Sequence, residues 1–227
     1  MLKSFVRSIA AASLVVTAGF VATPALAQAD QQKLVGQAEI TLSNFLRDPD
    51  MKWLQQNFGR AKAVLIAPEI VKAGFIFGGS GGRSVLFARD AKSGEWRGPV
   101  FYNMGTASVG FQAGVEVSEA ITLVMTEKGF NSLLATSVKL GGDASVAAGP
   151  VGAGAKSDVV ADLIAFSRSK GVYGGLNLDG TVLTAADDWN QAYYGKKVLP
   201  PDVLIRGDAK SAQADKLRAE IAKAAGK

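Results

Sequence analysis

Apolar positions near the start of the chain repeat every three or four residues, which predicts an amphipathic helix over residues 30–46. The face that should meet a core is made of Leu34, Ala38, Leu42, Phe45 and Leu46. Asp48 and Pro49 interrupt this pattern. Aspartate caps helices and proline fits their first turn, so we expect a second, short helix that runs to Phe58 and ends at Gly59.

Strand-forming residues then alternate with glycine. Residues 63–66 predict a buried strand that Pro68 stops. Ten glycines lie between Gly74 and Gly114, and glycine at this density indicates bulges, bends or close approach of two chains. Glu95 and Trp96 are expected in a turn. Four strands are predicted around these glycines, over residues 74–77, 84–89, 99–104 and 108–117.

The second half of the chain mixes short strands and helices. An apolar β-prone run covers 121–126, and a short helix is expected over 128–135. Residues 140–156 are rich in glycine and could form a flexible linker or a flat pair of strands. The strands are favoured because Val146 and Val151 punctuate the stretch, and β-like runs continue at 159–167 and 172–178.

Two further elements complete the predicted fold. Asp179 and Gly180 favour the tight turn of a hairpin, and a helix over 185–194 should end at Gly195. Alanine and lysine dominate residues 209–225, where Leu217 and Ile221 are the only large apolar residues. This face is thin, which predicts a peripheral or frayed helix.

The first 27 residues have the pattern of a secretory leader. Lys3 and Arg7 form a positive region, an apolar stretch covers 9–21, and the small residues Ala25 and Ala27 predict cleavage before Gln28. An uncleaved membrane anchor is the less favoured alternative, because polar residues and Pro24 interrupt the apolar stretch. We therefore expect a periplasmic or secreted protein with one domain over 28–204 and a polar helical tail over 205–227.

Composition removes several classes of function. The chain has no cysteine and no histidine, so neither a Ser-His-Asp nor a Cys-His site can form, and zinc lacks its favoured ligands. We therefore predict no enzyme, no metal site and no cofactor. The net charge of +5 becomes +3 once the two cations of the leader are removed, which is too small an excess to indicate nucleic acid.

Acidic pairs and glycine-rich motifs give weak alternatives. Asp187 and Asp188 are expected to open the helix that carries Trp189, and Asp158 and Asp162 to lie on a solvated surface. Residues 149–157 resemble a phosphate-binding P-loop, but an alanine separates the last glycine from the lysine. The glycines at 79–81 also fail the spacing of a dinucleotide fingerprint.

Several motifs in order resemble the SYLF domain family. They occur at 61–64 before Pro68, 72–82, Trp96 with Pro99, 105–114, Gly149-Pro150, 169–175 and 193–195. The resemblance spans about residues 34–204. It implies an α+β domain, with a strongly curved antiparallel sheet or barrel-like core flanked by helices, that binds membrane lipids in an exported bacterial protein. The resemblance associates phosphoinositide binding with eukaryotic members, but the lysine-rich first helix of the fungal and animal members is matched here by a segment with only Lys33 and Arg47 as cations. Actin binding is associated with some fungal members, and we do not carry it over because an exported bacterial protein normally meets no actin.

Basic and aromatic residues are the candidate lipid contacts. Cations attract anionic headgroups, and an aromatic ring can insert beside them. The candidates are Lys52, Trp53, Lys62, Lys72, Arg83, Arg89 and Arg97, with Phe58 as a second possible insertion. The alternatives are that the cations only solvate a surface and that Trp53 and Phe58 belong to the core. We thus expect a non-enzymatic protein that binds membrane lipids, with a lipid-independent structural or protein-interaction module as the alternative.

Overall fold

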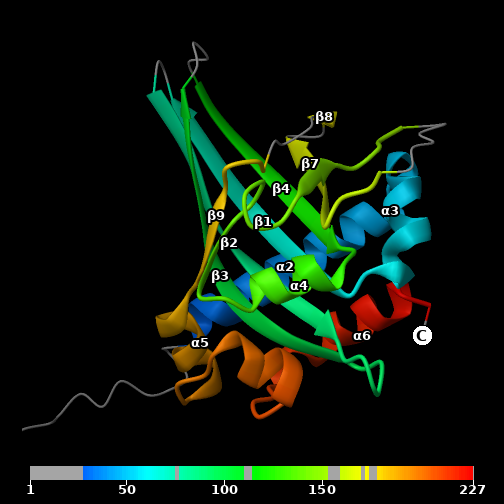
Figure 1. The fold of residues 1–227 in the computed structure, drawn as a ribbon, viewed down its shortest axis with the longest axis vertical. Helices are drawn as coiled ribbons and strands as arrows, with labels where there is room; N and C mark the ends of the chain where they lie inside the picture. The colour runs from blue at the N-terminus through cyan, green and yellow to red at the C-terminus, as the bar shows by residue number, and fades with distance from the viewer. Residues whose placement is uncertain are drawn as a thin grey trace, which may run out of the picture.

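A sheet that curls into a half-barrel forms the centre of the protein, with helices against both of its faces (Figure 1). This computed structural model describes residues 28–74, 77–109, 114–152, 159–169, 172–173 and 178–226. The expected leader and its cleavage site lie outside the described residues. The predicted α+β class, with one domain and a strongly curved, mainly antiparallel sheet, is confirmed.

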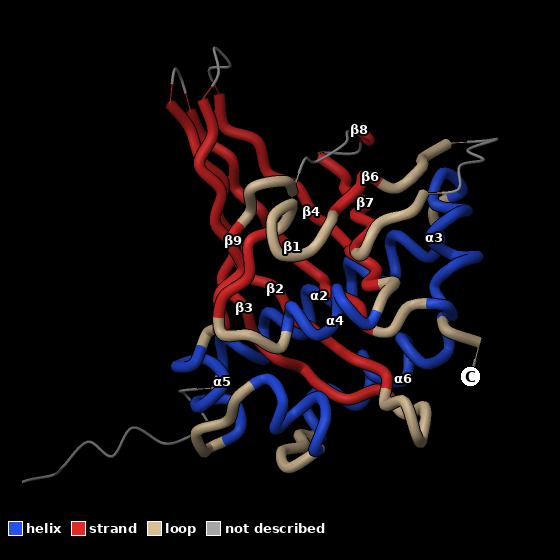
Figure 2. The backbone as a smooth tube through the Cα atoms, viewed as in Figure 1, coloured by secondary structure: helices blue, strands red, loops and turns tan. Residues whose placement is uncertain are grey.

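Nine strands make up the sheet in the described residues, and Figure 2 separates them from the helices by colour. The strands are β1 (Ala63–Gly74), β2 (Phe77–Arg89), β3 (Trp96–Val109), β4 (Gly114–Val124), β5 (Ser137–Lys139), β6 (Val146–Ala148), β7 (Leu163–Ser169), β8 (Val172–Tyr173) and β9 (Val182–Ala185). Their order is β5-β9-β3-β2-β1-β4-β7-β6, with β8 on β7. The β6–β7 pair is parallel, and the other pairs are antiparallel.

The helices are α2 (Ala29–Arg47), α3 (Lys52–Asn57), α4 (Glu127–Leu133), α5 (Asp187–Tyr194) and α6 (Asp215–Ala224). Short helical turns cover Pro49–Met51, Phe58–Arg60 and Ala212–Ala214, and a π-helical turn covers Asp202–Arg206. The side chain of Asp48 accepts a hydrogen bond from the Asp50 amide, as expected of a cap. The second helical stretch runs on through Gly59 to Arg60, so the predicted end at Gly59 is wrong by one residue.

The sheet separates two apolar clusters. The cluster on the α2 face joins the predicted face of α2 to alternate residues of the central strands, such as Val64 and Phe87, and includes Phe58 and Trp96. The opposite face carries the second cluster, in which Leu65 and Tyr102 pack with residues of α4 and of the π-helical turn. Each central strand is therefore buried on both sides, and few positions in it can be polar.

Four long strands replace the shorter ones that were predicted. Pro68 does not stop β1, because it lies in a bulge where Ala67 and Pro68 stand opposite the single residue Ser84 of β2. A proline that lacks an amide hydrogen is tolerated at a bulge. The glycines of β2 and β3 also lie within continuous strands, so the predicted breaks at 78–83 and 105–107 are wrong. Trp96 begins β3 rather than lying in the turn.

The paired strands β1 to β4 extend beyond the helices at one end (Figure 1). On the α2 face of this extension Val71 pairs with Val117, and Ala73 with Val115, next to Gly79 and Gly81 of β2. Val115 is 69% exposed. The β2–β3 turn lies at the opposite end of these strands. We call the end that carries this turn the closed end.

Residues 140–152 contain one short strand, β6, and a bridge between Leu140 and Ala144, so the prediction of strands holds only in part. Asp162, which was expected to be solvated, is only 8% exposed. Its carboxylate accepts hydrogen bonds from the hydroxyl of Thr126, the cap of α4, and from the amide and hydroxyl of Ser145. These hydrogen bonds, with Lys128 nearby, lower the pKa of Asp162 to about 2.

The last helices confirm one prediction and correct another. Helix α5 ends at Gly195, whose φ of 68° favours glycine, and Asp187 and Asp188 lie in its first turn as expected. The expectation of a peripheral C-terminal helix is wrong. Leu217 and Ile221 of α6 are fully buried in the α2-face cluster, and α6 packs against α2.

The bulge in β1 yields a stability prediction. A Cβ at Gly82 would lie 2.4 Å from the backbone oxygen of Glu69, so Gly82→Ala must distort two strands. We expect a loss of roughly 2–3 kcal/mol in the free energy of unfolding, measured by urea denaturation. Gly105→Ala, in the neighbouring strand with no atom within 4 Å of the new Cβ, is the matched control and should change it by about 0.5 kcal/mol or less. Equal effects of the two variants would contradict the close approach.

A second prediction concerns Asp162. Asp162→Asn weakens hydrogen bonds to an ionised acceptor and should cost about 2 kcal/mol at pH 7. The folded state lowers the pKa of this carboxyl, so its contribution is fully present above about pH 5 and is lost as the pH falls toward 2. Urea denaturation of the wild type and of Asp162→Asn from pH 7 to pH 2 should show that the difference between their free energies of unfolding becomes smaller. Asp187→Asn, at an exposed helix start, is the control. A stability difference between the wild type and Asp162→Asn that is as large at pH 2 as at pH 7 would contradict a contribution from the ionised carboxylate.

Candidate functional site

The turn between β2 and β3, at the closed end of the sheet, is held by Asp90. The Asp90 carboxylate accepts hydrogen bonds from the Ser93 amide at 2.7 Å and the Ser93 hydroxyl at 2.9 Å, and the Asp90 amide donates to the Glu95 oxygen. Donation from the Ser93 amide is the main reason that the pKa of Asp90 is lowered. The carboxylate therefore stays ionised and fixes the turn, which stands between two depressions in the surface.

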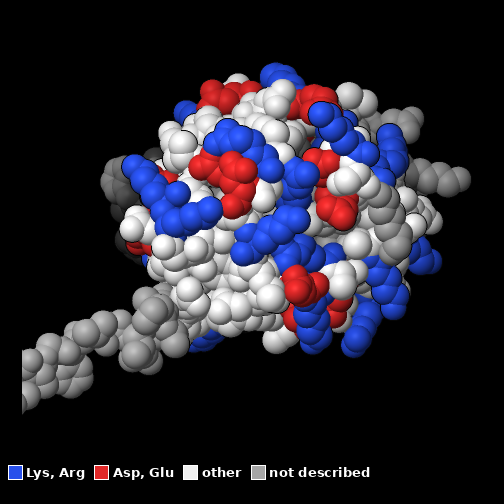
Figure 3. Space-filling view, turned by 90° about the horizontal axis from the view of Figure 1, so that it is seen from below, with Lys and Arg blue, Asp and Glu red and all other residues white. Residues whose placement is uncertain are grey.

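The larger depression, which we call the basic hollow, has a volume of about 970 Å³. It lies between the turn, the start of β1, helix α4 and the π-helical turn. Five cationic side chains and two carboxylates line it, so its charge is strongly positive. The cations are Arg60, Lys62, Arg89, Lys92 and Arg97, and the carboxylates are Asp90 and Glu127. Figure 3, seen from this end, shows Lys and Arg side chains gathered among fewer acidic ones.

Most of these cations are positioned by contacts within the fold. The Arg89 guanidinium donates to the Gly59 oxygen at 3.0 Å, and Lys62 forms an ion pair with Glu127 at 2.6 Å. Arg97 pairs with Asp90 at 2.9 Å and donates to the backbone oxygen of Ile205, which ties the β2–β3 turn to the π-helical turn. The Lys92 ammonium makes no hydrogen bond or ion pair with the described residues, so it is free to meet a ligand.

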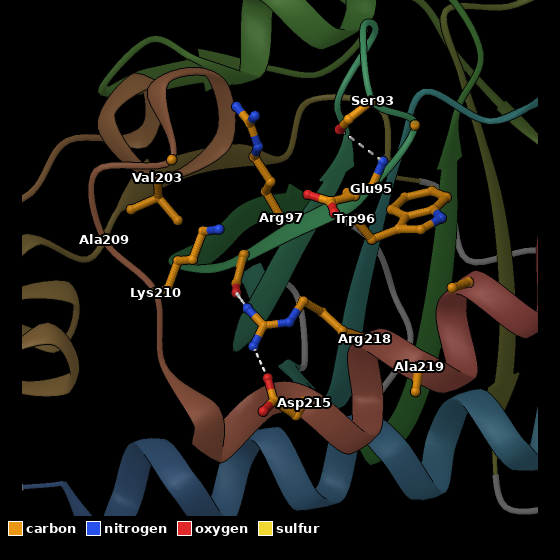
Figure 4. Close-up of a pocket in the computed structure, with 14 residues that line it drawn as sticks. Ser93, Glu95, Trp96, Arg97, Val203, Ala209, Lys210, Asp215, Arg218 and Ala219 are labelled. Atoms are coloured by element: carbon orange, nitrogen blue, oxygen red, sulfur yellow. Dashed lines mark hydrogen bonds and ion pairs between the residues drawn. The ribbon is translucent and has the colours of Figure 1, made fainter.

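A smaller depression, the amphipathic pocket, adjoins the hollow on the other side of Arg97. Its volume is about 480 Å³. Apolar side chains form its walls, namely Trp96, Val203, Ala209, Ala219 and Ala222, and the cations Arg97, Lys210 and Arg218 lie at its margin. Figure 4 shows Trp96 and Ala219 on one side, Lys210 on the other, and Arg218 between them. The pocket thus combines an apolar wall with positive charge.

Three polar groups define the chemistry of this pocket. Arg218 is fixed, because it donates to the backbone oxygens of Gly98 at 3.0 Å and Ser211 at 2.7 Å and pairs with Asp215. Lys210 is exposed and has no hydrogen bond or ion pair to the described residues. The Trp96 indole is 6% exposed, and its buried Nε1–H finds no acceptor in the described part of the chain. A buried donor without a partner is costly, but Figure 4 draws this nitrogen on the edge of the ring away from Lys210 and Arg218.

The structure brings together three of the seven predicted contacts, Lys62, Arg89 and Arg97. Lys52 lies exposed at the start of α3, away from both depressions. Trp53 is half-buried against Phe166, with ring centroids 5.8 Å apart, and Phe58 is fully buried, so both rings contribute to the core.

The two remaining predicted contacts, Lys72 and Arg83, lie on β1 and β2 toward the extension, away from the basic hollow. The Arg83 guanidinium stacks 4.1 Å from the centre of the Trp189 ring. The single basic face that the sequence suggested is therefore divided between two ends of the molecule.

Sequence reasoning missed four cations of the two depressions, namely Arg60, Lys92, Lys210 and Arg218. The turn sequence at Lys92 was a usable signal, since it marks an exposed tip. Lys210 and Arg218 lie more than a hundred residues further along the chain, and only the fold places them beside Trp96.

Two negative findings apply to the described residues only. No group of three or more Asp and Glu side chains there is arranged so that it could hold a metal ion. None of the helices has both the length and the apolar character needed to cross a bilayer.

Comparison with known proteins places these features in a family. The family model described as "Ysc84: Las17-binding protein actin regulator" matches residues 105–224, which is more than half of the chain. The matched region begins within β3 and includes β4 and α6. It contains eight of the fourteen residues that line the amphipathic pocket, but not Trp96.

Individual relatives agree with this match. LAS seventeen-binding protein 3 of Saccharomyces cerevisiae is 34% identical over 152 residues, which cover 64% of this chain and 33% of the relative. Human SH3 domain-containing YSC84-like protein 1 is 27% identical over 184 residues, covering 79% of this chain and 52% of the relative. The chain thus spans about a third of the yeast relative and half of the human one. These names describe binding proteins rather than enzymes.

The curled half-barrel, the order of the glycine-rich motifs and the match over residues 105–224 lead to one conclusion: this chain belongs to the Ysc84, or SYLF, domain family.

Proposed function

We propose that this protein is a non-enzymatic, peripheral membrane-binding protein that meets anionic lipid headgroups with its closed end. The observation that carries the proposal is the convergence of five cations on the basic hollow against two carboxylates. Both carboxylates are already paired, Asp90 with Arg97 and Glu127 with Lys62. The surplus positive charge therefore has no counterpart among the residues that line the hollow.

Electrostatic attraction of this size suits a reversible contact. Each cation close to an anionic bilayer contributes about 1 kcal/mol, and the effect falls off within a Debye length, about 10 Å at 0.1 M salt. The rim of the hollow adds apolar contact, because Ile205 is 48% exposed and Phe130 is half-buried beside the cations. Charge with a small apolar contribution is the usual composition of a surface that lies on a membrane.

The membrane in question is, on this proposal, that of a bacterial cell envelope. Residues 1–27 have the composition of a leader that would deliver the chain to the periplasm or outside the cell. The preorganised cations support headgroup binding without a conformational change, since Arg89 and Arg97 are held by backbone oxygens.

A protein partner is the second candidate, because the yeast relative is named for binding Las17 and the family for regulating actin. An acidic protein segment could use the same cations. Lipid dependence separates the two: capture of a defined envelope protein without lipid, together with failure to bind vesicles, would favour the protein-interaction module.

Vesicle co-sedimentation tests the proposal. The protein should bind vesicles that contain phosphatidylglycerol at low salt, bind pure phosphatidylcholine much less, and dissociate as salt rises. Lys92→Glu removes one attraction and adds one repulsion, so affinity for the anionic vesicles should fall roughly 10- to 30-fold.

Lys52→Glu is the matched control, since it makes the same charge change on an exposed residue outside both depressions, at a helix start that tolerates acid. It should leave affinity within about threefold of the wild type, as a distant charge does. Absence of binding to anionic vesicles at low salt would refute the proposed function. Equal losses in both variants would refute its location at the hollow.

A further inference from the structure

The amphipathic pocket beside the basic hollow has features that surface charge alone does not need. It lies between the β2–β3 turn, the segment that leads into α6, and α6 itself. Its volume of about 480 Å³ falls in the range of pockets that hold small molecules. A bilayer surface cannot enter such a depression, but one molecule or one chain can.

The walls of the pocket determine which part of a ligand they can accept. The buried residues Val203 and Ala209 form one side of the pocket, and the buried Trp96 with Ala219 of α6 forms the other. Ala222 of α6 also lines the pocket. Alanine side chains leave open the space that larger residues would fill. The lining therefore suits an alkyl chain, which gains by leaving water.

The margin of the pocket suits an anionic group. Lys210 points toward the pocket in Figure 4, and its ammonium has no partner in the described residues. The guanidinium of Arg218 lies next to it and is held in place by two backbone oxygens. Two carboxylates also line the pocket, Asp215 paired with Arg218 and Glu95 exposed in the turn, so the three cations leave a surplus of one positive charge.

The indole of Trp96 forms the aromatic part of the pocket wall. Its Nε1–H is buried and has no acceptor among the described residues, although Trp96 lines the pocket. Buried tryptophan normally donates this hydrogen bond. Figure 4 draws this nitrogen on the edge of the ring away from Lys210 and Arg218, so what the ring offers a ligand in the pocket is apolar surface.

We infer that the amphipathic pocket binds a single anionic amphiphile, with its alkyl chain against Trp96 and Ala219 and its charged head at Lys210. The inference deepens the proposed function by naming the class of molecule, and rests on it for the source of that molecule. Carboxylate and phosphate heads share the required chemistry. A fatty acid and a single-chain lipid phosphate are the two sources to be compared.

Binding can be measured with monomeric decanoate and decyl phosphate, each below the concentration at which it forms micelles. Calorimetry gives the affinity, and the NMR signals of the indole N–H groups report the position. The chain has three tryptophans, so Trp53 and Trp189 serve as internal controls. The Trp96 signal should shift with either ligand while the other two stay in place. Inorganic phosphate, which lacks the chain, should compete at least tenfold less well.

Two pairs of variants locate the contacts. Ala219→Phe fills the pocket and should weaken decanoate at least tenfold, whereas Ala212→Phe, at an exposed position outside it, should not. Lys210→Gln should weaken binding about five- to tenfold, and Lys223→Gln, exposed and outside the lining, is its control. Circular dichroism of each variant confirms that it is folded.

Each outcome decides between the two proposals. If neither amphiphile binds, or if Ala219→Phe leaves binding intact, the inference of an amphiphile site in the pocket is wrong. The proposed membrane contact stands in that case, provided that anionic vesicles still bind. Equal competition by inorganic phosphate also overturns the inference of an amphiphile site, since the site would then recognise only charge. Conversely, amphiphile binding without vesicle binding would sustain the pocket and refute the proposed membrane contact.

Discussion

The pairing of β1 with β2 across the bulge at Pro68 is the constraint on which the rest of the structure depends. The bulge changes the alternation of β1, so Val64 and Ile66 before it pack in the α2-face cluster and Val71 after it lines a depression together with Leu34 of α2. Without the bulge, Val71 would face the opposite side of the sheet, because successive side chains of a strand alternate between its faces. The close contact between Gly82 and the Glu69 oxygen fixes the register, and every other strand is added to this pair.

The register of β1 and β2 also explains why the long strands are buried on both faces at the closed end but extend beyond the helices at the other end. Toward the closed end, side chains on both faces are buried, and the strands finish in a turn that Asp90 fixes and Arg97 ties to the π-helical turn. Positive charge can gather there because the underlying backbone is rigid and supplies oxygens to orient the guanidinium groups. Toward the extension the helices end, and glycine, alanine and valine take the place of larger residues on the α2 face of the strands.

The sequence was informative where local patterns determine structure. The α2 face, the cap at Asp48 and the end of α5 at Gly195 follow from periodicity and capping, which depend on near neighbours. The strands were predicted in the right region but with wrong bounds: most were cut too short, and the predicted strands 74–77 and 108–117 each joined the end of one strand to the start of the next. Proline and glycine usually mark strand ends, and only the pairing shows that here they lie in a bulge and at close approaches.

The site was less predictable, for a physical reason. Lys62, Arg89 and Arg97 could be selected as cations, but nothing local distinguishes them from Lys52 or Lys72. Whether a cation is free, paired or stacked depends on groups distant in sequence, such as Glu127 for Lys62 and Trp189 for Arg83. The same holds for α6: two large apolar residues look too few for burial, until α2 supplies the facing surface.

The packing of α6 against α2 also bears on how the chain folds during synthesis. The strands β1, β2 and β3 pair with neighbours in sequence and can form as they leave the ribosome, after which β4 pairs with β1. The α2-face cluster, however, remains partly exposed until Leu217 and Ile221 are synthesised, about 180 residues after α2, the helix that they cover. Folding of this protein should therefore finish only after translation of α6. Until then, the exposed apolar side chains of the cluster form a surface that a chaperone can recognise.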